Sequence, residues 1–569
     1  MKLLKYSLVL LFFCSSVTAL AQTAQVMWGD EFKLKIRDAD LHVAWADNTG
    51  TYFIEEHLVL TSYFIIGSTS RESAGLVKLD KSLSEVYRKS FDKELRKKKY
   101  QDILFSKKKM YLLASDYDKG ERTISFFAME LNKASGEAQG DWKEISVFKL
   151  DTKRDDLKFR CTLTEDSTRF RVVTAMDGEK DTRYTVQEFN ENFAPVFSRV
   201  DIVHEVEPEK IDLEDILPIP NGNILFVARQ MDYEEGKKEK KRNLVFQNYN
   251  LRLYNSKGVF IKEVNPEVEG RWLINSKSVV LKNGDIGLAA FYSNAKKARE
   301  INGLMMMRIS SSDGSVISHS NQDISASMFT NEYEEDDEED EDETRAEKAE
   351  RKRFEKLSKD EDGISRSYKI RALTPTADGG MALVAEKFYT YTVRQYNQST
   401  RTWSTYIYYI SEDLIVSKFD DAGKISWIKL LPKRQQEQVS SGSFISASDY
   451  FVSRFQFPHW GGVSVFSIPG KNTFSILMND NPKNEGVVRA GQKAKAMLNP
   501  KKSHAFLLNV DLATGEIKRK FIFSNQDGNP AMLRHGVLMG NIFYMVGKRM
   551  GALGILSKPR IAVGKLTFK

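Results

Sequence analysis

The sequence contains very little cysteine, and this scarcity limits both its covalent structure and its metal chemistry. Only Cys14 and Cys161 occur in 569 residues. Cys14 falls within residues 1–21, which have the features of a cleavable secretory signal, so one cysteine remains in the mature chain. A single cysteine forms neither an intrachain disulfide nor a multi-cysteine metal site. We predict that Cys161, in the strand-like context FRCTL, is a small buried hydrophobic residue.

Long apolar segments are also missing. The most apolar stretch, Leu8–Phe13, follows two lysines and precedes the A-x-A cleavage pattern that ends at Ala21. It is too short to cross a bilayer as a stable helix. We therefore predict a signal peptide over residues 1–21, cleavage near Ala21, no transmembrane segment, and an extracytoplasmic location, periplasmic or secreted.

Several catalytic and binding motifs are absent as well. There is no G-x-S-x-G elbow, no Walker A loop and no H-E-x-x-H helix, and no nucleic-acid reader motif is present. The seven histidines are scattered without metal-ligand spacing: His42, His57, His204, His319, His459, His504 and His535. The sequence predicts no metal site, no cofactor and no nucleic-acid partner.

Charge is unevenly distributed along the chain. The formal net charge is +7, yet residues 332–343 (EYEEDDEEDEDE) contain eleven acidic side chains in twelve positions. Such a block repels itself and has little apolar area to bury, which is typical of disorder. The Ala-, Glu-, Lys- and Arg-rich stretch after it favours helix. We predict a charged, partly disordered and partly helical insertion over residues 331–364, either a solvated loop or a surface that docks a basic partner.

What is present is a two-part pattern that recurs eight times. A short apolar run follows a tight turn, and a second strand then ends in an Asp/Asn-x-x-Gly-like turn. The apolar runs are Thr51–Ile54, Met110–Ala114, Phe170–Ala175, Ile224–Ala228, Ile286–Tyr292, Met381–Ala385, Phe474–Met478 and Ile542–Val546. Repeats of about 40–55 residues with four strands each indicate propeller blades. The sequence predicts an all-β, eight-bladed β-propeller, with seven blades as the alternative; a β-sandwich is the competing fold.

The last unit is one strand short. Its final strand, Ile561–Leu566, runs almost to the C-terminus, whereas Val26–Lys35 precedes the first hairpin and lacks a partner there. We predict that these two segments pair and close a ring, because closure removes exposed sheet edges. No linker-like segment divides residues 22–569, so we expect one propeller domain.

Two clusters of side chains are candidate ligand-binding residues. A long hairpin carries Tyr389 and Tyr391 on one strand and Trp403, Tyr406 and Tyr408 on the other. The tyrosines of each strand share a face, so they either stabilise the hairpin by cross-strand pairing or form a stacking platform for sugar rings.

The second cluster is a loop-like segment with adjacent aromatic side chains. His459 and Trp460 lie in the sequence Phe457-Pro458-His459-Trp460-Gly461-Gly462. A histidine beside a tryptophan on a glycine-flanked turn either faces a ligand or has a structural role.

Some of the turns resemble those of a known propeller family. Residues 511–516 (DLATGE), 132–137 (NKASGE) and 421–427 (DAGKISW) are similar to the repeat turns of quinoprotein, or PQQ-type, propellers. That family repeats a docking tryptophan after the glycine, and here only Trp427 is comparable. Many of its enzymes also carry a vicinal disulfide, which one mature cysteine does not provide. The resemblance therefore implies the fold without the quinone cofactor. More broadly, the chain resembles poorly characterised secreted propellers of Gram-negative bacteria.

Function is less constrained than fold. The first hypothesis is a non-catalytic propeller that binds a protein or glycan ligand, or that acts as an envelope scaffold, because the repeat lacks a catalytic motif and propellers place function on their loops. The alternative is a secreted carbohydrate-active enzyme with paired carboxylates in the central cleft, since acidic residues are abundant but no pair is singled out.

Overall fold

The protein is built almost entirely of antiparallel β-sheets. The computed structural model describes residues 24–568 except 35–39, 64–66, 151–155, 165–166, 179, 197–198, 234–243, 265–269, 296–299, 325–363, 366, 398–400, 441–457, 469–471, 527 and 550–559. The predicted signal peptide lies outside these residues. Of the predicted insertion over 331–364, only Ile364 is described. No helix among the described residues is long and apolar enough to span a membrane.

Seven sheets take their four strands from consecutive parts of the chain. They are β3–β6 (Asp40–Asp47, Gly50–Tyr63, Gly67–Leu79, Glu85–Ser90), β7–β10 (Lys99–Phe105, Met110–Asp118, Thr123–Leu131, Ala138–Lys149), β11–β14 (Asp156–Leu163, Arg169–Asp177, Thr182–Asn190, Val200–His204), β15–β18 (Ile211–Pro218, Ile224–Tyr233, Leu244–Tyr254, Phe260–Val264), β19, β20, β22 and β23 (Trp272–Val280, Ile286–Ser293, Gly303–Ile309, Val316–Asp323), β25–β28 (Tyr368–Pro375, Met381–Asn397, Thr402–Phe419, Ile425–Ser440) and β29–β32 (Val463–Ser467, Thr473–Asp480, His504–Asp511, Ile517–Ser524).

The eighth large sheet joins the two ends of the described chain. It contains β33–β35 (Val537–Met539, Ile542–Arg549, Arg560–Phe568) together with β1 (Ala24–Trp28) and β2 (Phe32–Lys33). A two-stranded sheet of β21 (Glu300–Ile301) and β24 (Ile364–Ser365) and short 3₁₀ helices at Pro208–Lys210, Pro482–Asn484, Pro500–Lys502 and Leu533–His535 complete the elements.

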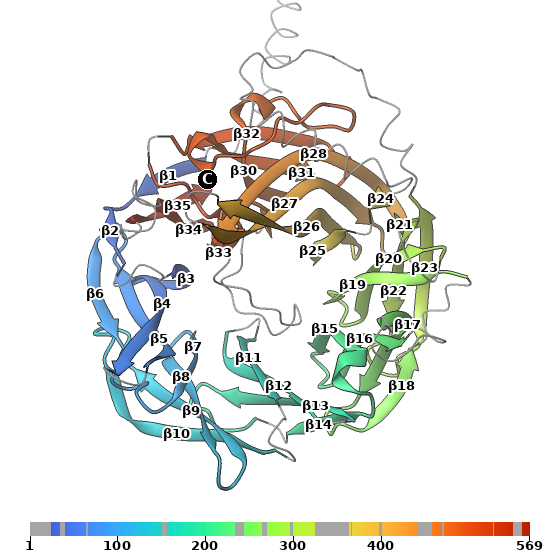
Figure 1. Ribbon diagram of the computed structural model, residues 1–569. Helices are drawn as coiled ribbons and strands as arrows, with labels where there is room; N and C mark the ends of the chain where they lie inside the picture. The colour runs from blue at the N-terminus through green and yellow to red at the C-terminus, as the bar shows by residue number, and fades with distance from the viewer. Residues whose placement is uncertain are drawn as a thin grey trace, which may run out of the picture.

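The sheets follow one another around a ring, as Figure 1 shows, with the first strand of most sheets toward the centre. Each of the eight apolar clusters among the described residues lies between two neighbouring sheets. One of them joins the first sheet to the last, through Phe53 and Val77 on one side and Tyr544 and Val546 on the other. The predicted all-β propeller fold is confirmed. The number of blades stays a prediction, because segments between the sheets, such as 441–457, lie outside the described residues.

The predicted closure by the N-terminal segment is present. Val26 is opposite Leu566 in an antiparallel register, and Phe32 is opposite Ile561. The predicted single strand Val26–Lys35 is instead two short strands, and Lys35 lies outside the described residues. The strands separate at Gly29, where a Cβ atom would lie 2.8 Å from Leu83, so the backbone approaches a neighbouring turn too closely for a side chain.

Two of the glycine turns, those at Gly515 and Gly136, are contacted by a ring from the preceding sheet. Gly515 has a φ of +72°, and a Cβ atom there would lie 2.7 Å from the ring of Trp427, whose Nε1 donates to the carbonyl of Leu512. Gly136 has a φ of +73°, and a Cβ atom there would lie 2.5 Å from the ring of Tyr87. A glycine at these turns therefore serves two needs, a left-handed backbone and space for the docking ring.

Candidate functional site

The sheet β25–β28 extends well beyond its neighbours. Strands β26, β27 and β28 have 17, 18 and 16 residues, longer than any other described strand. We call residues 387–397, 402–413 and 433–440 the extended sheet. All five predicted aromatic residues of the hairpin lie in it.

The four predicted tyrosines share one face of the extended sheet. Tyr391 is directly opposite Tyr408, and Tyr389 and Tyr406 lie two residues away along their own strands. Because side chains alternate between faces, all four project to the same side. The rings of Tyr391 and Tyr408 stack with centroids 4.8 Å apart and planes 5° from parallel. The predicted cross-strand pairing is present, while ligand binding by these rings stays a prediction.

Trp403 lies at the tip of the hairpin, on the face opposite the tyrosines. It is opposite Tyr396 in the register, and the two ring centroids are 5.1 Å apart. Trp403 is 68% exposed and Tyr396 is 45% exposed. Two large rings that remain in solvent at one tip form an apolar surface that nothing in the described chain covers.

Buried ionic side chains support the base of the extended sheet. The Nζ atom of Lys433 donates to Oε1 of Glu386 at 2.7 Å, and both side chains are 0% exposed. Nε of Arg371 donates to the second oxygen of Glu386, also at 2.7 Å. Lys433 also donates to Gln435, whose amide oxygen accepts from the backbone N–H of Gly462. These bonds link β26 and β28 to the start of the next sheet.

His459 and Trp460 lie at this base, within the protein. The carboxylate of Glu437 accepts from both of their backbone N–H groups at 2.9 Å. The indole Nε1 of Trp460 donates to the carbonyl of Pro530 at 3.1 Å, and His459 is 7% exposed. Glu437 is opposite Tyr409 in the register, so it lies on the face away from the four tyrosines. The structure therefore does not bring the two predicted clusters together.

A one-residue bulge recurs in the innermost strands. The register skips Ala44 in β3, Gln101 in β7, Glu214 in β15, Ile274 in β19 and Arg371 in β25. A bulge adds local twist and redirects the extra side chain.

In three sheets the bulge residue contacts a side chain on the second strand. Gln101 donates to Ser115, Glu214 pairs with Arg229 and Arg371 pairs with Glu386. The three partners, Ser115, Arg229 and Glu386, each directly follow an alanine on the second strand. In each sheet this alanine is opposite the residue that precedes the bulge. These bulge pairs therefore occupy the same place in three sheets.

Glu214 is the bulge residue that is a buried carboxyl group. Its side chain accepts from the backbone N–H and the hydroxyl of Ser276 on the neighbouring inner strand, at 2.9 and 2.8 Å. Arg229 lies 3.1 Å from its other oxygen and also contacts Asp212. Burial outweighs the attraction of Arg229 and raises the pKa of Glu214 to about 7. Asp212 and Glu214 are therefore two carboxylates that share one arginine near the centre of the ring.

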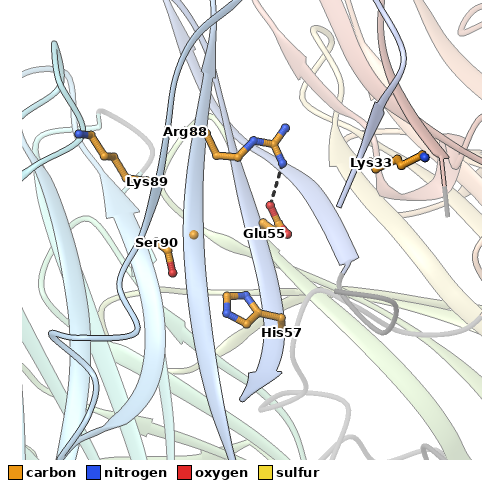
Figure 2. Close-up of a pocket in the computed structure, with 7 residues that line it drawn as sticks. Lys33, Glu55, His57, Arg88, Lys89 and Ser90 are labelled. Carbon is orange, nitrogen blue, oxygen red and sulfur yellow. Dashed lines mark hydrogen bonds and ion pairs between the residues drawn. The ribbon is translucent and has the colours of Figure 1, made fainter. Parts of the chain in front are cut away.

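A cavity of about 320 Å³ opens where the ring closes. We call it the seam pocket. Lys33 of β2 supplies one wall, and the sheet β3–β6 supplies the others; Figure 2 shows the lining residues, which are Lys33, Glu55, His57, Gly75, Arg88, Lys89 and Ser90. Its volume lies at the lower end of the range for small-molecule sites.

The described residues do not form a cluster of histidine, cysteine and carboxylate groups able to hold a metal ion. Cys161 is buried, as its strand-like context predicts.

Sequence reasoning missed the buried ion pairs and the seam pocket. A usable signal for the ion pairs exists, because Glu386 and Arg229 each directly follow an apolar run that the sequence predicts as a buried strand. A charge in that position requires a buried partner. The seam pocket has no comparable signal, because Lys33 meets its other residues only through closure of the ring.

No protein-family model matches this sequence, and comparison with curated proteins finds no match. Solved structures similar to the chain include prolyl oligopeptidase B from Galerina marginata, at 11% identity and a TM-score of 0.27, with 64% of this chain covered. The chain spans 38% of the length of that oligopeptidase.

Two similar structures are matched over almost their whole length. The β-propeller domain of the Trilobed protease from Pyrococcus furiosus is 9% identical with a TM-score of 0.30, covering 86% of this chain and 98% of that one. The Nup133 β-propeller domain of Vanderwaltozyma polyspora is 10% identical with a TM-score of 0.32, covering 82% and 100%. The likeness is one of fold only.

Proposed function

We propose that the protein is a non-catalytic, extracytoplasmic propeller that binds a glycan through the tip of the extended sheet. The observation that carries this proposal is the exposure of Trp403 and Tyr396, 68% and 45%, on neighbouring strands. The apolar face of a sugar ring is complementary to such aromatic surfaces, and a hairpin held at its base by buried ion pairs presents them with little entropy cost.

The proposal is tested by retention on immobilised polysaccharides. Trp403→Ala removes the most exposed ring, and we expect affinity to fall about tenfold, which corresponds to about 1.4 kcal/mol. Tyr117→Ala is the matched control, because Tyr117 is also an exposed aromatic residue, 40% exposed, on a different hairpin. Equal retention of the wild type and Trp403→Ala would contradict the proposal.

The same variant distinguishes a protein ligand from a glycan ligand. If no polysaccharide is retained but a protein from an envelope extract binds the wild type and not Trp403→Ala, the tip binds a protein rather than a glycan. Binding that is independent of the tip would leave an envelope scaffold as the function.

One observation favours the carbohydrate-active enzyme as a second candidate. Glu214 has a pKa raised to about 7, and Asp212 shares Arg229 with it. A carboxyl group whose pKa is raised to about 7 is partly protonated at neutral pH, which suits general acid catalysis. A polysaccharide panel assayed with wild type and Glu214→Gln tests this: turnover that the variant lacks supports an enzyme, and no turnover by the wild type excludes it for those substrates.

A further inference from the structure

The seam pocket is shared by the two ends of the ring. Lys33 belongs to β2, which pairs with the last strand, whereas Glu55 and His57 belong to β4 of the first sheet. Gly75 lies opposite Glu55 in the register, and its lack of a side chain leaves room beside the carboxylate. A molecule in this cavity would therefore touch both sides of the closure.

His57 presents an unsatisfied polar atom to this pocket. The residue is 6% exposed, and its Nε2 lies 3.0 Å from Oδ1 of Asp92, which also accepts from the hydroxyl of Ser73. Its Nδ1 atom is buried and has no hydrogen-bond partner among the described residues. The tautomer that donates from Nε2 to the Asp92 carboxylate leaves Nδ1 as an acceptor for a hydroxyl donor. A buried polar atom without a partner is uncommon, and a ligand hydroxyl would satisfy it.

The lining has an excess of positive charge. It contains three cationic side chains, those of Lys33, Arg88 and Lys89, and one carboxylate, that of Glu55. Arg88 is committed to Glu55 at 3.1 Å, while Lys89 contacts Glu137 at 3.1 Å. Lys33 is exposed and forms no ion pair with a described residue. An anionic group at the pocket mouth would complement Lys33.

Figure 2 shows the imidazole of His57 below the Glu55–Arg88 pair, with Ser90 to one side and Lys33 on the opposite wall. In this view the side chains of Lys33 and Lys89 extend outward, away from the Glu55–Arg88 pair and from His57, so the two lysines place positive charge at the edge of the cavity rather than in its interior. This arrangement suits a ligand that has hydroxyl groups for its interior and one negative charge for its rim.

We propose that the seam pocket binds a small acidic sugar, a ring with one carboxylate and several hydroxyl groups. The carboxylate lies against Lys33, one hydroxyl donates to Nδ1 of His57, and other hydroxyls donate to Glu55. The pocket shares no residue with the tip of the extended sheet, so this site is independent of the proposed glycan-binding surface, and either can fail without the other.

Isothermal titration calorimetry of the full chain with glucuronate, glucose and acetate tests the assignment. We expect glucuronate to bind at least tenfold more tightly than glucose, which lacks the charge, and than acetate, which lacks the hydroxyl groups. Lys33→Met should weaken glucuronate binding about tenfold, and His57→Gln should weaken it by a similar factor. Lys119→Met is the matched control, because Lys119 is an exposed lysine in a turn away from the pocket.

Several results would overturn the proposal. The first is the absence of saturable glucuronate binding up to about 10 mM, where a ligand with a Kd of about 1 mM would fill about nine tenths of the sites. The second is equal glucuronate binding to wild type and Lys33→Met. Because Lys33 is exposed, we expect this variant to fold even if His57→Gln does not. Acetate or glucose binding as tightly as glucuronate would overturn the acidic-sugar assignment.

Discussion

Two ion pairs hold the same place in their sheets with the charges exchanged. In the sheet β15–β18 the bulge residue is the acid, Glu214, and the second strand supplies Arg229, 3.1 Å away. In the sheet β25–β28 the bulge residue is the base, Arg371, and the second strand supplies Glu386, 2.7 Å away. The register around both bulges is the same, so the difference between them comes from their surroundings.

Those surroundings shift the pKa values of the two carboxyl groups in opposite directions. Burial alone would raise the pKa of Glu386, but the charges of Lys433 and Arg371 outweigh it and hold that pKa at about 2. For Glu214, burial exceeds the attraction of Arg229, and the pKa rises to about 7. The same kind of bulge pair can thus contain a carboxyl group that stays ionised down to about pH 2 or one that titrates near neutrality, according to how many cations surround that group.

The largest expected effect on stability comes from removing Lys433, the additional cation that contacts Glu386. Lys433→Met leaves Glu386 at 0% exposure with one partner fewer, and breaking a buried pair in this way costs about 3–5 kcal/mol of unfolding free energy. Urea unfolding followed by fluorescence measures the loss. The matched control is Lys89→Met, which breaks an exposed pair with Glu137 and should cost less than about 1 kcal/mol. Equal losses for the two variants would show that burial of the Glu386 pair contributes nothing.

The next effect is a pair of opposite pH dependences. A lowered folded-state pKa gives stability that is present above the ordinary value of 4.5 and is lost as the pH falls toward 2, which is the case for Glu386. A raised folded-state pKa, as for Glu214, gives stability that is present below pH 4.5. This stability is lost as the pH rises through about 7. Each shift corresponds to on the order of 3 kcal/mol.

Unfolding free energies measured from pH 2 to 8 separate the two contributions. Glu386→Gln should remove the loss of stability on the acid side, and Glu214→Gln should remove the loss between pH 4.5 and about 7. If both variants lose the same part of the profile, the two sites do not differ in the way their surroundings indicate.

Repetition made the fold predictable from sequence. The turn glycines and apolar runs set each sheet, and the surplus strand that begins near Val26 had its natural partner in the segment that ends at Leu566. The stacking of Tyr391 on Tyr408 followed from the two-residue period of strands. The turns, the apolar runs and the stacked tyrosines depend on neighbouring residues, and the closing pair follows from the one strand that the last unit lacks.

The buried pairs and the seam pocket depend on distant residues. A bulge at Arg371 appears only when two strands are placed in register, and Glu386 and Lys433 are 47 residues apart. The seam pocket forms because β2, which carries Lys33, pairs with β35 at the other end of the chain and so lies beside the first sheet. Nothing in a single strand indicates which distant side chain it will face.

The smallest effect on stability is expected at the uncharged bulge pair, Gln101 and Ser115. Gln101 is the bulge residue of β7, and its amide donates to the hydroxyl of Ser115 at 2.9 Å. A hydrogen bond between neutral groups contributes about 0.5–1.5 kcal/mol, so Gln101→Ala should lower the unfolding free energy by that amount and leave its pH dependence unchanged. Gln139→Ala, an exposed glutamine on β10, is the control and should stay within about 0.5 kcal/mol of the wild type. A loss at Gln101 as large as that of Lys433→Met would mean that the bulge itself, rather than the charges placed on it, provides the stability.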